Sequence, residues 1–220
     1  MNIEPIAEFH SPLTEKFGIP RQAGLVPELR GTIRFLPPYN VAEALRGLDG
    51  FDYVWLIWGF HLNSGGGAFQ PTVRPPRLGG NERTGVFACR SPFRPNGLGL
   101  SSVRIESIDV SNCGITVLGA DLADGTPIDD VKPSVEYADS HRNVRSGFVD
   151  STEWKPLDVH IPEDIASSMT PERLESLRGI LAQDPRPRYQ HDSQRIYGLS
   201  FDGRNIRFRV EEDTLDVLEA

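Results

Sequence analysis

The sequence predicts a mainly β protein, an antiparallel barrel or sandwich followed by a small α+β unit. Over the first 150 or so residues, short apolar segments are separated by glycine and proline. No long helical pattern lies between these segments, and sequential strands without intervening helices pair as antiparallel neighbours. The remaining residues change to one helical pattern and one hairpin pattern, which marks a second unit.

The expected strands of the first unit differ in composition. Residues 51–60 are nearly all bulky and apolar, which is typical of a strand buried on both faces. A glycine-rich stretch follows at 63–71 and has the composition of a loop. The other expected strands are residues 31–36, 84–89, 100–110 and 115–120.

The tail carries helix and hairpin signals. Thr-Pro-Glu at 170–172 places an N-cap, a first-turn proline and a first-turn acid in the favoured order. Leucines over 174–181 then recur at helical spacing. Asp-Gly at 202–203 separates two apolar runs and predicts a hairpin. We therefore expect a barrel domain over 1–158 and a small α+β domain over 159–220.

Composition excludes several classes of protein. No apolar run approaches the roughly 20 residues that span a bilayer, and the N-terminus lacks a signal-peptide pattern. Cys89 and Cys113 have neither metal-ligand spacing nor the density of a disulfide scaffold, and the five histidines are scattered. We expect a cytoplasmic protein without a membrane span or a metal site.

Arginine is concentrated in two regions despite the net charge of −8. Residues 70–100 hold five arginines against one acid, and residues 186–209 hold six against two. Only three of the 23 basic residues are lysine. Because the planar guanidinium suits phosphate and base contacts, these two regions are compatible with a nucleic-acid partner.

Four polar loops stand out, while the common nucleotide, metalloprotease and serine-hydrolase motifs are absent. The loops cover 18–24, 60–63, 90–96 and 121–133; the last places acids and a lysine around a tight turn. Each alone is typical of a surface loop that uses charge for solubility. Their recurrence after successive strands favours a binding site, because binding sites in barrels gather at strand ends.

Several of these segments resemble the TsaA-like family of tRNA adenosine-37 N6-methyltransferases. The similarity runs from about residue 3 to 210 and includes the tail motifs LAQDPRP at 181–187 and YG at 197–198. In the first unit it rests on PRQAGLVP at 20–27, VRPPRLGGN at 73–81, RSPFRPN at 90–96, GADL at 119–122, DGTP at 124–127, VKP at 131–133 and YAD at 137–139.

The resemblance implies a β-barrel enzyme that acts as a homodimer. Its expected methyl donor is S-adenosylmethionine, and its expected acceptor is the 6-amino nitrogen of N-threonylcarbamoyl-adenosine beside the anticodon of threonine tRNA. Arg90 would pair with the methionine carboxylate, and Leu100 would pack on an apolar part of the cofactor. The full cofactor-binding set implied is Gln22, Ala23, Gly24, His61, Leu62, Arg90, Leu100, Asp121, Leu122, Ala123, Asp124, Gly125 and Thr126.

Catalysis and tRNA binding are assigned less directly. The acceptor nitrogen must lose a proton to a base, a water or a carbonyl, and the motifs suggest Asp130, Lys132 and Tyr137 as candidates; a structural salt bridge of Lys132 is the alternative. Phe69 or Phe93 would stack on loop bases. The arginines expected to contact tRNA are Arg74, Arg77, Arg83, Arg94, Arg186 and Arg188. Two rival functions are a non-catalytic S-adenosylmethionine- or RNA-binding barrel and a methyltransferase for a small metabolite.

Overall fold

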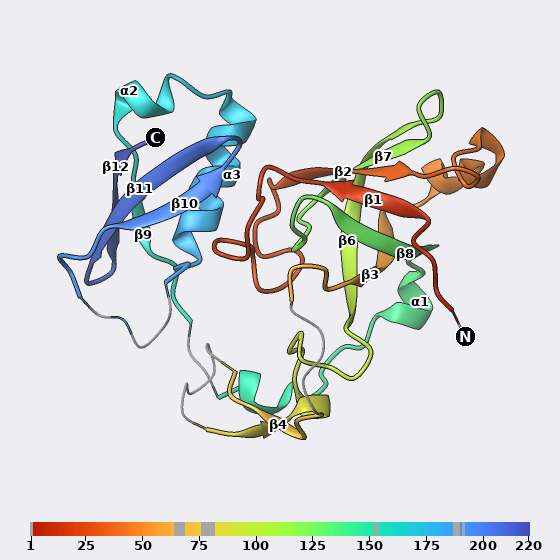
Figure 1. The fold of residues 1–220 in the computed structure, drawn as a ribbon, viewed down its shortest axis with the longest axis horizontal. Helices are drawn as coiled ribbons and strands as arrows, with labels where there is room; N and C mark the ends of the chain where they lie inside the picture. The colour runs from red at the N-terminus through yellow and green to blue at the C-terminus, as the bar shows by residue number, and fades with distance from the viewer. Residues whose placement is uncertain (1, 64–68, 76–81, 152–153, 187–189, 191) are drawn as a thin grey trace.

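The computed structural model describes residues 2–63, 69–75, 82–151, 154–186, 190 and 192–220. Figure 1 shows a barrel, a separate C-terminal sheet with its helix, and a smaller part below them, which we call the lobe and which carries the paired strands β4 (Thr72–Val73) and β5 (Thr84–Gly85). The predicted fold class, mainly β with an antiparallel barrel and a small α+β unit, is confirmed.

Six antiparallel strands close the barrel in the order β1-β2-β7-β6-β3-β8. Closure leaves the barrel with no free strand edge. The strands are β1 (Ala7–His10), β2 (Arg30–Phe35), β3 (Tyr53–Gly59), β6 (Leu98–Asp109), β7 (Gly114–Leu118) and β8 (Thr126–Pro133).

The barrel interior is filled by alternate residues of each strand. On β3, Val54, Leu56 and Trp58 point inward and are buried, whereas Tyr53 is exposed. The expectation that residues 51–60 are buried on both faces was therefore wrong for this strand, because a closed barrel gives each strand one interior and one exterior face.

Two strand predictions in the first unit also need correction. Only Thr84–Gly85 of the expected strand 84–89 forms a strand, β5, because its partner β4 is two residues long. A 3-10 helix, Val86–Ala88, follows it directly. The acid-rich segment expected as a turn region forms β8, in which a bulge at Ile57/Trp58 of its partner breaks the alternation.

The C-terminal unit is a four-stranded sheet covered by helix α3 (Pro171–Ala182). The predicted N-cap is confirmed, since the side chain of Thr170 accepts from Arg173 N. The predicted hairpin is also confirmed, as β10 (Tyr197–Phe201) and β11 (Arg204–Glu211). Two strands of this sheet were not predicted: β12 (Thr214–Glu219) and β9 (Asp158–His160), which runs parallel to β12.

Residues 11–29, which link β1 to β2, join the two units. They leave the barrel and return to it, and on the way Leu13, Val26 and Leu29 are buried in the hydrophobic core of the C-terminal unit. Figure 1 shows this segment between the C-terminal sheet and the barrel. The second core is therefore built from both ends of the chain.

The remaining elements are short. These elements are the helices α1 (Glu136–Asp139) and α2 (Glu163–Ala166) and the 3-10 helices η1 (Ala42–Leu45), η2 (Leu48–Gly50), η3 (Val86–Ala88) and η4 (Gly147–Val149). None of the helices in the described part of the chain has the length and apolar character needed to cross a bilayer.

Gly31 in β2 lies directly against the buried ring of Phe9. A methyl group added at Gly31 would lie 2.1 Å from Cζ of that ring. We expect Gly31→Ala to destabilise the barrel by about 1–3 kcal/mol, because a close-packed interior accepts added volume only with strain. Urea unfolding followed by tryptophan fluorescence measures the loss.

Gly50→Ala is the matched control, because a methyl group added at Gly50 meets no atom within 4 Å. Its free energy of unfolding should stay within about 0.5 kcal/mol of the unchanged protein. If the two variants are equally stable, the Phe9 ring can move to accommodate the added methyl group, and the predicted strain at Gly31 is wrong.

Candidate functional site

Three of the four polar loops meet at the carboxyl group of Asp121, just after β7. Its Oδ1 accepts a hydrogen bond from Ser101 Oγ at 2.6 Å. The backbone N–H of Ala23 also donates to this carboxyl group, and the positive charge of Arg90 lies close enough to act on it. We call Gln22, Ala23, Arg90, Ser101 and Asp121 the Asp121 cluster.

Burial raises the pKa of Asp121. The hydrogen bonds from Ser101 and Ala23, together with the charge of Arg90, act in the opposite direction but do not cancel the cost of removing the carboxylate from water. Ser101 is itself buried and accepts from Trp58 Nε1 at 3.0 Å, so a polar chain runs from the barrel interior to Asp121. Acids with shifted pKa values are concentrated at functional sites.

Arg90 links the lobe to the segment that carries Gln22. Its Nη1 donates to Gln22 Oε1, and the residue is exposed. The guanidinium therefore lies at the surface of the cluster, and its charge acts on the half-buried Asp121. A guanidinium beside a carboxyl group suits a ligand that has both a carboxylate and donor groups.

Two glycines allow the backbone of residues 22–24 to lie against the barrel. Gly24 N donates to Gly119 O at 2.8 Å. Gly119 has a φ of +77°, and a methyl group added there would lie 3.4 Å from Gly24 N. A side chain at Gly119 would thus be strained and would press on the segment that approaches the cluster.

A second group of the expected residues surrounds the turn at Asp124 and Gly125. Asp124 Oδ1 accepts from Ser11 N at 3.0 Å and lies 3.4 Å from His10 Nδ1. On the other side of the turn, a methyl group added at Gly125 would lie 4.0 Å from His61 Nε2. His61 and Leu62 are exposed at the end of β3.

Three expected cofactor residues lie in the protein interior. The side chains of Leu122, Ala123 and Thr126 are buried, and the Thr126 hydroxyl group donates to Ala123 O at 2.7 Å. These residues hold the turn in place by packing. Only their backbone groups are available to a ligand.

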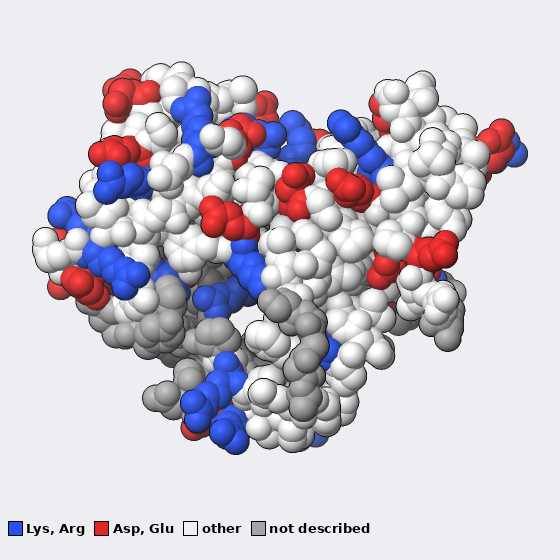
Figure 2. Space-filling model, viewed as in Figure 1, with Lys and Arg blue, Asp and Glu red and all other residues white. Residues whose placement is uncertain are grey.

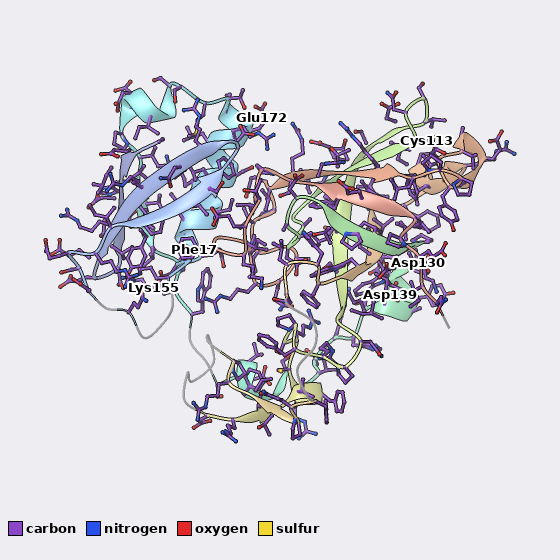
Figure 3. All side chains as sticks on the ribbon, viewed as in Figure 1. Phe17, Cys113, Asp130, Asp139, Lys155 and Glu172 are labelled. Atoms are coloured by element: carbon purple, nitrogen blue, oxygen red, sulfur yellow. The ribbon has the colours of Figure 1, made fainter. Side chains whose placement is uncertain are left out.

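The remaining expected residues lie on the outer face of the barrel. The strand register aligns Leu100 of β6, Ile57 of β3 and Asp130 of β8 in one row. In the neighbouring row on the same face, Lys132 of β8 lies beside Trp55 of β3. Leu100 is 58% exposed and Tyr137, on α1, is 92% exposed. Figure 3 shows Asp130 and Asp139 on the side of the barrel away from the C-terminal sheet.

Asp130, Lys132 and Tyr137 are not joined to the Asp121 cluster by any hydrogen bond or ion pair among the described residues. Asp130 Oδ1 instead accepts from the neighbouring Val131 N at 2.9 Å. Within the part of the chain that the structure describes, no acid is bonded to Lys132, and the His, Cys, Asp and Glu side chains form no group that could hold a metal ion.

The expected tRNA-binding arginines differ in what they contact. Arg74 and Arg83 are exposed and flank the paired residues of β4 and β5, so the register brings them side by side. Arg94 donates to the carbonyl groups of Val86 and Cys89. Arg186 is 10% exposed and binds Asp184 through two nitrogens. Arg77 and Arg188 lie outside the described residues.

Sequence reasoning missed Ser101, His10 and Ser11 at the site, and Phe87 in the lobe. Ser101 occupies an inward position of β6, and only its hydrogen bond from the buried Trp58, which faces Gly99 on the same strand, shows its polar role. Phe87 is 72% exposed and stacks on Phe69, which is 57% exposed. Figure 2 shows Lys and Arg side chains on both sides of a hollow between the lobe and the two larger units.

Two family descriptions together cover most of the chain. The tRNA-methyltransferase O N-terminal domain matches residues 8–140, and the TrmO C-terminal domain matches residues 155–220. The first match contains the Asp121 cluster, and the second contains α3 and the C-terminal sheet.

The chain is similar to named proteins over nearly its whole length. It is 38% identical to the tRNA (adenine(37)-N6)-methyltransferase of Escherichia coli, over 97% of this chain and 95% of that protein. A relative from Pseudomonas aeruginosa is 40% identical over 90% of this chain and 87% of its own, and its name includes the words S-adenosylmethionine-dependent methyltransferase. The crystal structure of TrmO from Pseudomonas aeruginosa aligns with a TM-score of 0.80 at 32% identity, covering 100% of this chain and 98% of that one. The chain therefore belongs to the tRNA-methyltransferase O family of S-adenosylmethionine-dependent tRNA methyltransferases.

Proposed function

We propose that this protein transfers the methyl group of S-adenosylmethionine to the 6-amino nitrogen of N-threonylcarbamoyl-adenosine at position 37 of tRNA, with threonine tRNA as a substrate. The relative from Escherichia coli is named for methylation of N6 of adenine 37 in tRNA. The observation that carries the proposal is the Asp121 cluster, in which Gln22, Arg90 and Asp121 come together from three separate loops.

The Asp121 cluster has the donors and acceptors that S-adenosylmethionine needs. Arg90 would pair with the methionine carboxylate, and Asp121 would accept from the amino group or the ribose hydroxyls. The backbone at Gly24 and Gly125 carries no side chain that would prevent close approach. When bound, the cofactor supplies a methyl carbon on a positively charged sulfur.

In the reaction, the acceptor nitrogen forms a bond to the methyl carbon as the carbon–sulfur bond breaks and the neutral thioether leaves. The chain would contribute mainly by aligning the two groups and excluding water. The nitrogen must also lose its proton. Asp130, Lys132 and Tyr137 remain our candidates for that step, since Asp130 lies in one row with Leu100 on the outer face of the barrel.

The lobe is our candidate for the tRNA contact. Arg74 and Arg83 would bind backbone phosphates, and the stacked rings of Phe69 and Phe87 would offer a surface for an unstacked loop base. Arg94 would act there indirectly. It donates to the carbonyl groups of Val86 and Cys89, and its guanidinium carbon lies 5.9 Å from the centre of the Phe87 ring. We further propose that the enzyme works as a homodimer in the cytoplasm.

Methyl transfer to defined tRNA tests the function directly. With labelled S-adenosylmethionine, we expect label in threonine tRNA that carries the threonylcarbamoyl group and none in the same tRNA without it. Binding of cofactor without transfer would favour the non-catalytic barrel. Binding of tRNA that does not weaken as salt rises would favour a small-metabolite enzyme, because phosphate contacts are strongly salt-dependent.

Arg90→Ala tests the assignment of the cofactor site. Loss of one charge-assisted pair to the methionine carboxylate should weaken S-adenosylmethionine binding by about ten-fold or more, and tRNA binding much less. Isothermal titration calorimetry measures the first and filter binding the second. Arg83→Ala is the matched control, for which we expect a larger loss of tRNA binding than of cofactor binding. If Arg90→Ala weakens tRNA binding more than S-adenosylmethionine binding, the assignment is wrong.

Asp121→Asn should change how stability depends on pH. Because the folded state raises the pKa of Asp121, the carboxylate is disfavoured on folding, and this cost develops as pH rises from the ordinary carboxyl pKa of the unfolded chain towards the raised pKa of the folded state. An amide cannot ionise, so the variant should gain stability relative to the unchanged protein as pH rises above the ordinary carboxyl pKa of about 4. Urea unfolding at several pH values measures the difference.

Asp139→Asn is a control of opposite sign. Hydrogen bonds from Val135 N, Trp55 Nε1 and Ser134 Oγ lower the pKa of Asp139, so its contribution is present at neutral pH and lost as pH falls. That variant should lose stability relative to the unchanged protein as pH rises. The same trend in both variants would contradict the assigned direction for Asp121.

A further inference from the structure

We propose that the C-terminal unit positions the cofactor-binding residues Gln22, Ala23 and Gly24, so that α3 controls affinity for S-adenosylmethionine without touching it. The inference rests on the proposed function, since it assumes that these residues bind the cofactor. It gives the C-terminal unit a role inside the active site in addition to any contact with tRNA.

One face of α3 holds the chain on the C-terminal side of the cofactor residues. Ser176 and Gly179 lie at helical spacing on this face, and Gln183 is the C-cap residue that follows the helix. Ser176 Oγ lies 2.8 Å from Glu28 O, and Gln183 Nε2 donates to Leu25 O at 3.3 Å. A methyl group added at Gly179 would lie 2.7 Å from Val26 Cγ1, so helix and segment are in direct contact.

The C-terminal sheet holds the chain on the other side of the cofactor residues. The ring of Phe17 stacks on Phe208 of β11 with centroids 6.4 Å apart. A methyl group added at Gly18 would lie 2.1 Å from Leu199 Cδ1 of β10. Asp202 N, in the hairpin turn, donates to Pro12 O at 2.8 Å.

Residues 20–24 therefore form a short bridge between two anchored stretches. Both anchors belong to the C-terminal unit, whereas the bridge itself meets the barrel through Gly24 N and Ala23 N. A bridge this short cannot absorb a displacement of its anchors, so a shift of α3 would move Gln22 relative to Arg90 and Asp121. Small displacements of binding groups are costly to a preorganised site.

The charges of the C-terminal unit also fit a positioning role. Many of its arginines are bonded within the unit, which leaves less free positive charge for a polyanion than the sequence suggests. The pairs are Arg173–Asp202, Arg186–Asp184, Arg207–Glu219 and Arg209–Asp216, and Arg178 donates to Val159 O.

Gly179→Ala in the full-length protein tests the inference. The added methyl group displaces Val26 and with it the bridge, so calorimetry should show S-adenosylmethionine binding weakened by about three- to ten-fold, with tRNA affinity changed by less than about two-fold. Gly179→Ala with Val26→Ala removes the collision and should restore cofactor affinity. The rescue distinguishes positioning from a general loss of stability, because Val26→Ala shortens a buried side chain and would lower stability further.

Two further variants complete the design. Glu175→Ala, at an exposed position of α3, should bind the cofactor like the unchanged protein. Ser176→Ala removes the hydroxyl group near Glu28 O and should weaken binding in the same direction as Gly179→Ala, which covers the case that the glycine variant does not fold. All affinities are measured below the onset of unfolding of each variant.

The outcomes separate this inference from the proposed function. If the unchanged protein binds S-adenosylmethionine and folded Gly179→Ala and Ser176→Ala bind it equally well, the positioning role is wrong and the function stands. If tRNA affinity falls in step with cofactor affinity, the unit acts on both ligands and the specific claim is also wrong. If the unchanged protein does not bind S-adenosylmethionine, the proposed function fails and the inference fails with it.

Discussion

The hydrogen bond from Gly24 N to Gly119 O is the contact on which the arrangement of the site depends. It attaches a segment anchored in the C-terminal core to the loop that follows β7 in the barrel. Asp121 lies two residues beyond Gly119, so the same contact brings Ala23 within hydrogen-bonding distance of the buried carboxyl group. Without a glycine at 119, whose φ is +77°, the two backbones could not approach as closely.

Local signals in the sequence predicted much of the fold. The Asp-Gly turn at 202–203 and the cap at Thr170 were identified because each depends on neighbouring residues alone. Strand β8 was missed because Asp129 and Asp130 break its apolar alternation at a bulge, and a bulge is defined by the partner strand. The burial of β3 was overestimated because Trp55 and Ile57 lie on the outer face despite their apolar character.

The candidate site was predictable as a set of loops, but its geometry was not. Gln22, Arg90 and Asp121 were chosen from separate motifs, and only the fold shows that they converge. Ser101 was missed because its role comes from Trp58 on the neighbouring strand. Similarly, Arg186 and Arg94 could be counted as positive charge in the sequence, but their partners within the chain are visible only in three dimensions.

Closure of the barrel restricts how this protein can associate with other molecules. Every barrel strand has a hydrogen-bonded neighbour on both sides, so no row of free backbone groups is available to an incoming strand. Anything that docks on the barrel must therefore recognise side chains and loops. The C-terminal sheet differs, because β10 and β9 are its outer strands and each has a bonded neighbour on one side only. Association through backbone pairing is thus possible at the C-terminal sheet and at the two-stranded sheet of β4 and β5, but not at the barrel wall. A partner of the barrel contacts individual side chains, so each such contact can change through a single substitution.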